Sequence, residues 1–216
     1  MNFVLNGSTP QARRAFIKKP VFQNFNTNNL KYLDVLTYVA IKSFDNPEQR
    51  CFPSYETIAD KSGLSRTFTV ESVDRLETSK YLSVYREKKF KAPNRSYPNR
   101  YSFPDYEEFN QVPLELLSSS DLTSNEKAML LLLKQFSNSP KDIIGSITTF
   151  ADDLGLSYQT IRKQYNSLVN KGYLDDSRLK SKLTKLLKID WSFPDYLPIK
   201  HRKQDYDTSN LSLIIT

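Results

Sequence analysis

The chain contains an internal repeat, and this repeat limits its possible folds more than any other feature of the sequence. Residues 57–82 align with residues 149–174 at a constant offset of 92, without a gap, and nine of the 26 aligned positions are identical. The pentapeptide Ser-Phe-Pro-Asp-Tyr also occurs twice, at 102–106 and at 192–196. The period is too long and the copy number too low for a solenoid, so the repeat predicts two copies of one small domain.

Composition narrows the chemistry that these domains can perform. The formal net charge of +7 favours a polyanionic partner. The chain has one histidine, His201, and one cysteine, Cys51, which do not assemble a structural zinc site or a Cys–His nucleophile pair in any convincing way. Its five glycines form no phosphate-binding loop. We therefore expect a protein that is not an enzyme and that needs no metal or other cofactor.

The sequence also indicates where the protein works. Its longest apolar stretch, Met129–Leu133, is far shorter than the roughly 18 residues that a membrane-spanning helix requires. Residues 1–20 contain no secretory apolar region, and a single cysteine suits a reducing compartment. We expect a cytoplasmic protein without a membrane partner.

In the first copy, the sequence predicts three helices followed by a two-stranded antiparallel ribbon. Ser54 and Ser65 are suitable N-caps for the second and third helices. Gly63 lies between those helices and can adopt the positive φ of a sharp turn. The predicted helices are 30–44, 54–61 and 66–79, and the predicted strands are 81–85 and 100–103.

The second copy predicts the same order of elements. Thr123-Ser124-Asn125-Glu126 forms a capping box that opens a helix through Phe136. Gly155 then marks the turn, Ser157 caps the next helix, and Gly172 ends it. On the inner faces of the two third helices we expect Thr69, Val73 and Leu76, matched by Ile161, Tyr165 and Leu168. The strands of the second ribbon are expected from Tyr173 and at 186–193.

A family resemblance follows from these motifs. Residues 53–59 and 62–66, followed by Leu76 and Tyr81-Leu82, resemble the winged helix-turn-helix domain of phage and plasmid replication proteins and bacterial regulators. The resemblance covers 30–106 and 112–196 and implies an α+β, mainly α fold. This fold consists of two winged helix-turn-helix domains in tandem, each with three helices and a two-stranded wing. The expected division is an N-terminal arm at 1–29, domains at 30–108 and 109–199, and a C-terminal tail at 200–216.

The chain departs from the family pattern at two points. Thr69 stands where an aliphatic residue is usual, and Asp175-Asp176 interrupts the first strand of the second wing.

The resemblance also implies a DNA-binding surface. The second helix of a helix-turn-helix enters the major groove, and wing lysines and arginines contact the backbone or the minor groove. Gln159 and Asn166 suit adenine and Arg162 suits guanine, whereas Glu71 and Asp74 are expected to be solvated. The expected DNA-binding residues are Arg66, Thr67, Lys88, Lys89, Lys91 and Arg95 in the first copy, and Tyr158, Gln159, Arg162, Lys163, Asn166, Lys180 and Lys182 in the second.

The leading functional prediction is sequence-specific binding of double-stranded DNA, in replication initiation or transcriptional control of a phage or plasmid. Replication or transcription proteins are further candidate partners, and the chain is a monomer or a homodimer. Two alternatives stay open at this point: a winged-helix module that binds proteins, and an architectural DNA-binding protein without sequence preference.

Overall fold

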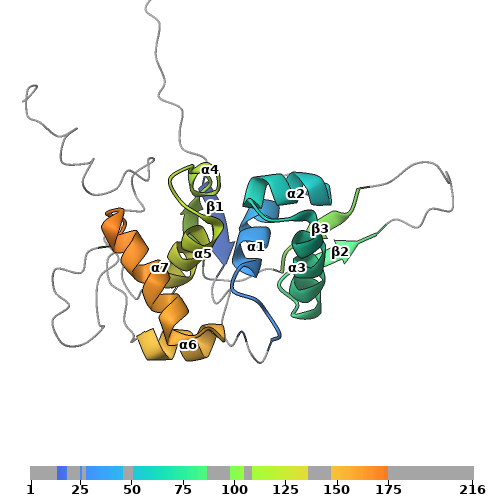
Figure 1. Ribbon diagram of the computed structural model, residues 1–216. Helices are drawn as coiled ribbons and strands as arrows, with labels where there is room; N and C mark the ends of the chain where they lie inside the picture. The colour runs from blue at the N-terminus through green and yellow to red at the C-terminus, as the bar shows by residue number, and fades with distance from the viewer. Residues whose placement is uncertain are drawn as a thin grey trace, which may run out of the picture.

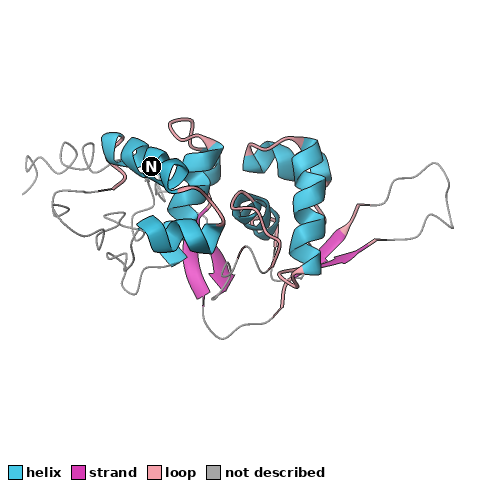
Figure 2. Ribbon diagram, turned by 60° about the horizontal axis from the view of Figure 1, so that its bottom comes forward, coloured by secondary structure: helices cyan, strands magenta, loops and turns pink. Residues whose placement is uncertain are grey.

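The computed structural model describes residues 14–18, 25, 28–45, 51–86, 98–104, 109–135 and 147–174. Within these ranges the protein is mainly helical, with seven α-helices and four short strands that form two separate two-stranded sheets (Figures 1 and 2). None of the described helices combines the length and apolar character needed to cross a membrane.

The first copy of the repeat folds in the predicted order. Its elements are α1 (Asp34–Lys42), α2 (Tyr55–Ser62), α3 (Arg66–Thr78), β2 (Ser83–Tyr85) and β3 (Arg100–Ser102). The strands β2 and β3 pair antiparallel, with Val84 opposite Tyr101. Helix α1 is shorter than predicted, because residues 30–31 have no regular secondary structure and residues 32–33 and 43–44 form turns. Cys51 is buried beside the ribbon, and its carbonyl accepts a hydrogen bond from the Tyr101 backbone N–H at 2.8 Å.

The second copy gives three helices of the same order, α5 (Ser124–Gln135), α6 (Ile147–Leu154) and α7 (Tyr158–Asn170). Tyr173 and Leu174 follow α7 and are buried, as Tyr81 and Leu82 are after α3. The predicted strand at 186–193, and with it the second wing, lies outside the described residues.

The turns between the second and third helices match closely in the two copies. Gly63 has φ 69° and Gly155 has φ 62°, a left-handed conformation that glycine adopts without steric cost. Ser65 Oγ accepts a hydrogen bond from the Phe68 N–H at 3.2 Å, and Ser157 Oγ accepts one from the Thr160 N–H at 3.2 Å. Both predicted turns and both predicted N-caps are therefore confirmed.

A second antiparallel ribbon was not predicted. Strand β1 (Arg14–Lys18) pairs with β4 (Phe109–Pro113), with Arg14 opposite Pro113 and Lys18 opposite Phe109, and the short helix α4 (Glu115–Ser118) follows β4. β1 falls within the segment predicted to be an arm at 1–29. Its pairing partner is distant in the sequence, so no local pattern reveals the strand; the domain boundaries themselves stay a prediction.

Helices α1 and α5 lie side by side in the middle of the molecule, with α2 and α3 beyond α1 and with α6 and α7 beyond α5 (Figure 1). Every residue from Asp34 to Ile41 is buried, and so is every residue from Glu126 to Leu133. A helix buried on all sides is typical of a central position. The Ser124 hydroxyl also donates a hydrogen bond to the Gly63 carbonyl at 2.9 Å, which joins the start of α5 to the turn of the first copy.

The third helices end in the same backbone motif with different residues. After α7, Gly172 has φ 81°, and the Tyr173 N–H donates to the Leu168 carbonyl at 2.9 Å. After α3, the aligned residue is Lys80, with φ 62°, and the Tyr81 N–H donates to the Leu76 carbonyl at 2.9 Å. This is the Schellman motif, in which the left-handed position favours glycine.

We therefore predict that Lys80→Gly stabilises the protein by about 1 kcal/mol, because it removes the steric cost of a side chain at positive φ. Urea unfolding followed by circular dichroism measures the difference. Lys80→Ala is the matched control, since it removes the charge but keeps a Cβ. An equal gain from both variants would show that the backbone conformation is not the cause.

Candidate nucleic-acid interface

Helix α7 presents a basic polar face to solvent. Tyr158, Gln159, Arg162, Lys163 and Asn166 are all exposed. The inner face consists, as predicted, of the buried residues Ile161, Tyr165 and Leu168. The sequence of α7 contains two basic residues and no acidic one.

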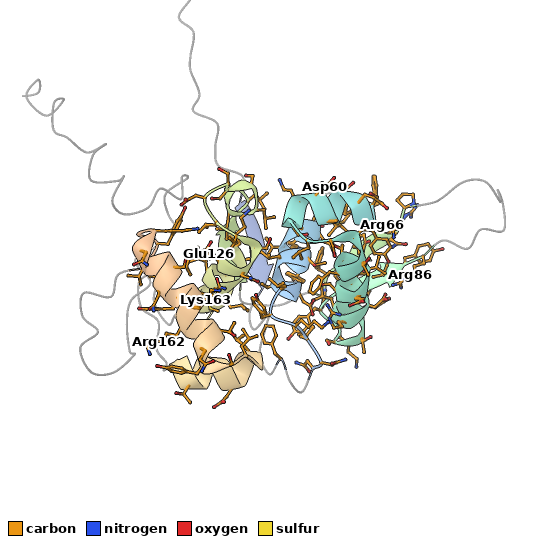
Figure 3. The ribbon with its side chains drawn as sticks, in the orientation of Figure 1. Asp60, Arg66, Arg86, Glu126, Arg162 and Lys163 are labelled. Atoms are coloured by element: carbon orange, nitrogen blue, oxygen red, sulfur yellow. The ribbon has the colours of Figure 1, made fainter. Side chains whose placement is uncertain are left out.

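The two cations of α7 extend into solvent (Figure 3). Among the side chains that the structure describes, none forms an ion pair with Arg162 or Lys163. Within the described part of the chain, both charges are thus available for an external anion.

Helix α3 presents a different surface, because its first basic residue already has an acidic partner. Arg66 Nε donates to Glu56 Oε1 of α2 at 2.5 Å, and both side chains are more than half exposed. The hydrogen bond from Arg66 lowers the pKa of Glu56. Thr67 is exposed beside Arg66.

Helix α3 also carries three acidic residues, and each of them has a cationic partner. Arg86, which follows β2, contacts Glu77 at 2.6 Å and Asp74 at 3.1 Å. Glu71 lies 3.5 Å from Arg75 and 3.8 Å from Lys31. The outer face of α3 is therefore balanced in charge. The side chains of Glu71 and Asp74 are more than half exposed, as expected, and they also take part in ion pairs.

Each copy also contains a buried carboxylate between its first and third helices. In the first copy this is Asp34 of α1, whose side chain is fully buried. Arg75 of α3 binds it through two hydrogen bonds, Nε to Oδ2 at 2.9 Å and Nη2 to Oδ1 at 2.7 Å. The Lys31 N–H donates to Oδ2 at 2.8 Å, and hydrogen bonding to Asp34 raises the pKa of Arg75.

In the second copy the corresponding carboxylate is Glu126 of α5, which is 3% exposed. Its Oε1 accepts a hydrogen bond from Ser167 Oγ of α7 at 2.5 Å, and its Oε2 lies 2.9 Å from Lys171 Nζ. Oε2 also accepts from the Thr123 N–H at 2.7 Å, while the Glu126 N–H donates to Thr123 Oγ1 at 3.3 Å. The predicted capping box is confirmed, and its carboxylate additionally binds α7.

Asp34 and Glu126 are equivalent in the repeat, since they are separated by the same 92 positions as Gly63 and Gly155. Their partners Arg75 and Ser167 are separated by 92 positions as well. The sequence predicted the capping box that includes Glu126 in the second copy, but it did not predict the buried carboxylate of Asp34 in the first copy. Lys31 is not a capping residue and contributes only its backbone N–H to the Asp34 carboxylate. The sequence signal that could have revealed Asp34 was therefore its alignment with Glu126 at the repeat offset of 92.

Lys88, Lys89, Lys91, Arg95, Lys180 and Lys182 all lie outside the described residues. Among the residues that the structure does describe, no group of three or more His, Cys, Asp or Glu side chains could hold a metal ion.

Residues 28–82 match the family model of a helix-turn-helix domain. The match covers α1, α2 and α3 and extends to the buried Leu82 after α3. It supports DNA as a partner of this part of the chain. No curated protein and no solved structure matched the chain.

The Glu126 cluster leads to a pH prediction. Burial alone would raise the pKa of Glu126, but hydrogen bonds from Ser167, Lys171 and Thr123 outweigh it and lower the pKa to about 2. The unfolded chain takes up this proton near the ordinary pKa of 4.5. The cluster therefore contributes its full stability above pH 4.5, and this contribution is lost as the pH falls towards 2.

We expect Glu126→Gln to remove an acid-dependent part of the free energy of unfolding that amounts to about 3 kcal/mol. Urea unfolding of both proteins at several pH values between 6 and 2.5 measures the two slopes. Parallel slopes for wild type and variant would contradict the assignment.

Proposed function

We propose that this protein binds double-stranded DNA in a sequence-specific manner through two tandem winged helix-turn-helix domains. In this proposal α7 reads base edges, while α3 and the first wing anchor the DNA backbone. The observation that carries the proposal is the contrast between the two exposed helix faces. Arg162 and Lys163 of α7 have no described acidic partner, whereas Arg66, Arg75 and Arg86 around α3 are all paired.

The tandem arrangement is supported by geometry that recurs in both copies. The turn glycines share a left-handed φ, the third helices share a serine N-cap, and each first helix holds a buried carboxylate. The helix-turn-helix match covers the first copy alone, so the second domain is inferred from its likeness to the first.

The exposed residues of α7 suit base recognition. The N-terminal half of a reading helix faces the base edges in the major groove. Gln159 and Asn166 can each make two hydrogen bonds with adenine, and Arg162 can do so with guanine. Lys163 would contribute charge to the phosphate backbone.

Helix α3 is less suited to reading base edges than α7, and its contact with the DNA backbone depends on Arg66. Its sequence has three acidic and two basic residues, a net charge of −1, against +2 for α7. The Arg66–Glu56 pair is exposed, and exposed pairs are weak, so Arg66 can exchange Glu56 for a phosphate.

The biological process that fits this proposal is replication initiation or transcriptional control of a phage or plasmid. A protein-binding module is the second candidate, because the charge-balanced face of α3 also suits a protein partner. Gel-shift titration against genomic and random DNA fragments separates the two, since a protein-binding module would bind neither.

The proposed function predicts that DNA affinity depends strongly on salt concentration. If the interface neutralises about 6–10 phosphates, the affinity for DNA should fall roughly a thousandfold or more between 50 and 200 mM salt. Fluorescence anisotropy with a labelled duplex measures this slope. A slope near zero would argue against the backbone contacts.

The proposed function also predicts that α7 and the first wing contribute differently to DNA binding. The double variant Gln159→Ala, Arg162→Ala should lose about tenfold or more of its affinity for a selected site and little for random DNA. The double variant Lys88→Ala, Lys89→Ala should weaken binding to both duplexes equally. It should also reduce the slope of log affinity against log salt concentration by about two. Equal losses on both duplexes for both variants would overturn the assignment of reading to α7.

A further inference from the structure

The buried carboxylate of the second copy lies at one end of the candidate reading helix. Ser167 comes five residues after Arg162, which places it about 7.5 Å further along the axis of α7. Lys171 follows the last helical residue, and its Nζ donates to the Asp121 carbonyl at 2.6 Å as well as to Glu126. The C-terminal half of α7 is thus bound to the start of α5, while its N-terminal half carries the exposed Gln159, Arg162 and Lys163.

Apolar packing alone would leave this geometry underdetermined. The stripe formed by Ile161, Tyr165 and Leu168 determines which face of α7 is buried, but hydrophobic attraction has no preferred direction. Hydrogen bonds do have one. A carboxylate that binds both the backbone of residue 123 and the side chain of Ser167 fixes the rotation and tilt of α7 relative to α5.

We propose that Glu126 is a positioning residue for base reading. By holding Ser167 and Lys171, it sets the angle at which α7 presents Gln159 and Arg162 to the major groove. This inference rests on the proposed function, in which α7 reads DNA. Base contacts tolerate displacements of only about 0.5 Å, so a small rotation of α7 should weaken specific binding far more than contacts with phosphate.

The first copy contains an equivalent buried carboxylate with a different partner on the third helix, and this supports a positioning role for Glu126. Asp34 binds the Lys31 N–H and the guanidinium of Arg75, in the way that Glu126 binds the Thr123 N–H and Ser167. The two carboxylates occupy equivalent positions in the repeat, whereas their partners on the third helices differ. In each copy the third helix is therefore oriented by the same position of the first helix.

Two substitutions separate positioning from stability. Ser167→Ala removes the hydrogen bond to α7 and leaves the capping box intact. Thr123→Ala removes the side-chain cap of α5 and the 2.9 Å hydrogen bond that Thr123 Oγ1 donates to Glu126 Oε2, and it leaves the Ser167 and Lys171 contacts intact. Each deletes one hydroxyl from the same cluster, so they form a matched pair. Thermal unfolding first establishes that both full-length variants are folded at the assay temperature.

The probes are a duplex that the wild-type chain selects from a random pool and a scrambled duplex of equal length and composition. Ser167→Ala should lose about tenfold in affinity for the selected duplex and less than about twofold for the scrambled one. Thr123→Ala should retain wild-type affinity for both. The loss caused by Ser167→Ala should also shrink when Gln159 and Arg162 are already alanine, because the contacts that it misplaces are then absent.

The outcomes are distinct. Wild-type affinity of folded Ser167→Ala for the selected duplex would overturn the proposal, as would an equal loss on both duplexes or an equal loss in Thr123→Ala. If the wild-type chain selects no duplex at all, the proposed function itself fails, and that result is seen before any variant is tested.

Discussion

The structure depends on a buried carboxylate that is present once in each copy of the repeat. Removing a carboxylate from water is costly unless its oxygens are bound, so Asp34 and Glu126 each require a donor set that surrounds them. Both obtain it from the backbone just before their own helix and from the third helix of the same copy. The need to satisfy one charge thereby ties the beginning of the first helix to the far half of the third helix. Apolar packing then acts on helices whose relative direction is already defined.

The second constraint is the burial of α1 and α5 on all sides. Neither helix has a solvated face over most of its length. Each therefore packs against helices of its own copy on one side and against the first helix of the other copy on the opposite side. The hydrogen bond from Ser124 to the Gly63 carbonyl ties the start of α5 to the turn of the first copy. A side chain at position 63 would place its Cβ 3.2 Å from Ser124 Oγ, so glycine there meets both the backbone conformation and the contact between the copies. In Figure 1 this arrangement leaves α3 and α7 on opposite outer sides of the central pair.

The two copies share these buried positions, although several of the residue types there differ, and they diverge most in charge on the surface. Glu71 and Asp74 of α3 have cationic partners, whereas the aligned residues of α7 are Lys163 and Asn166. Arg162 of α7 aligns with the uncharged Val70. A common interior and a divergent exterior are compatible because solvated side chains contribute little to stability. The exposed residues can therefore vary with the partner while the interior fixes the fold, and this separation supports different roles for the two helices.

The sequence by itself determined the repeat, the order of helices, the turns at Gly63 and Gly155 and the serine caps, because these depend on residues close together in the chain. It also separated the exposed residues of α7 from its buried stripe, since helical spacing decides both. Only the tertiary structure decided the pairing of 14–18 with 109–113, the contact of α1 with α5, and the partners of Arg66, Arg75 and Arg86. Those interactions join residues far apart in the sequence, or side chains whose direction depends on how helices cross. The left-handed conformation of Lys80 belongs to the same class, since the motif that ends α3 imposes it on a residue with no preference for it.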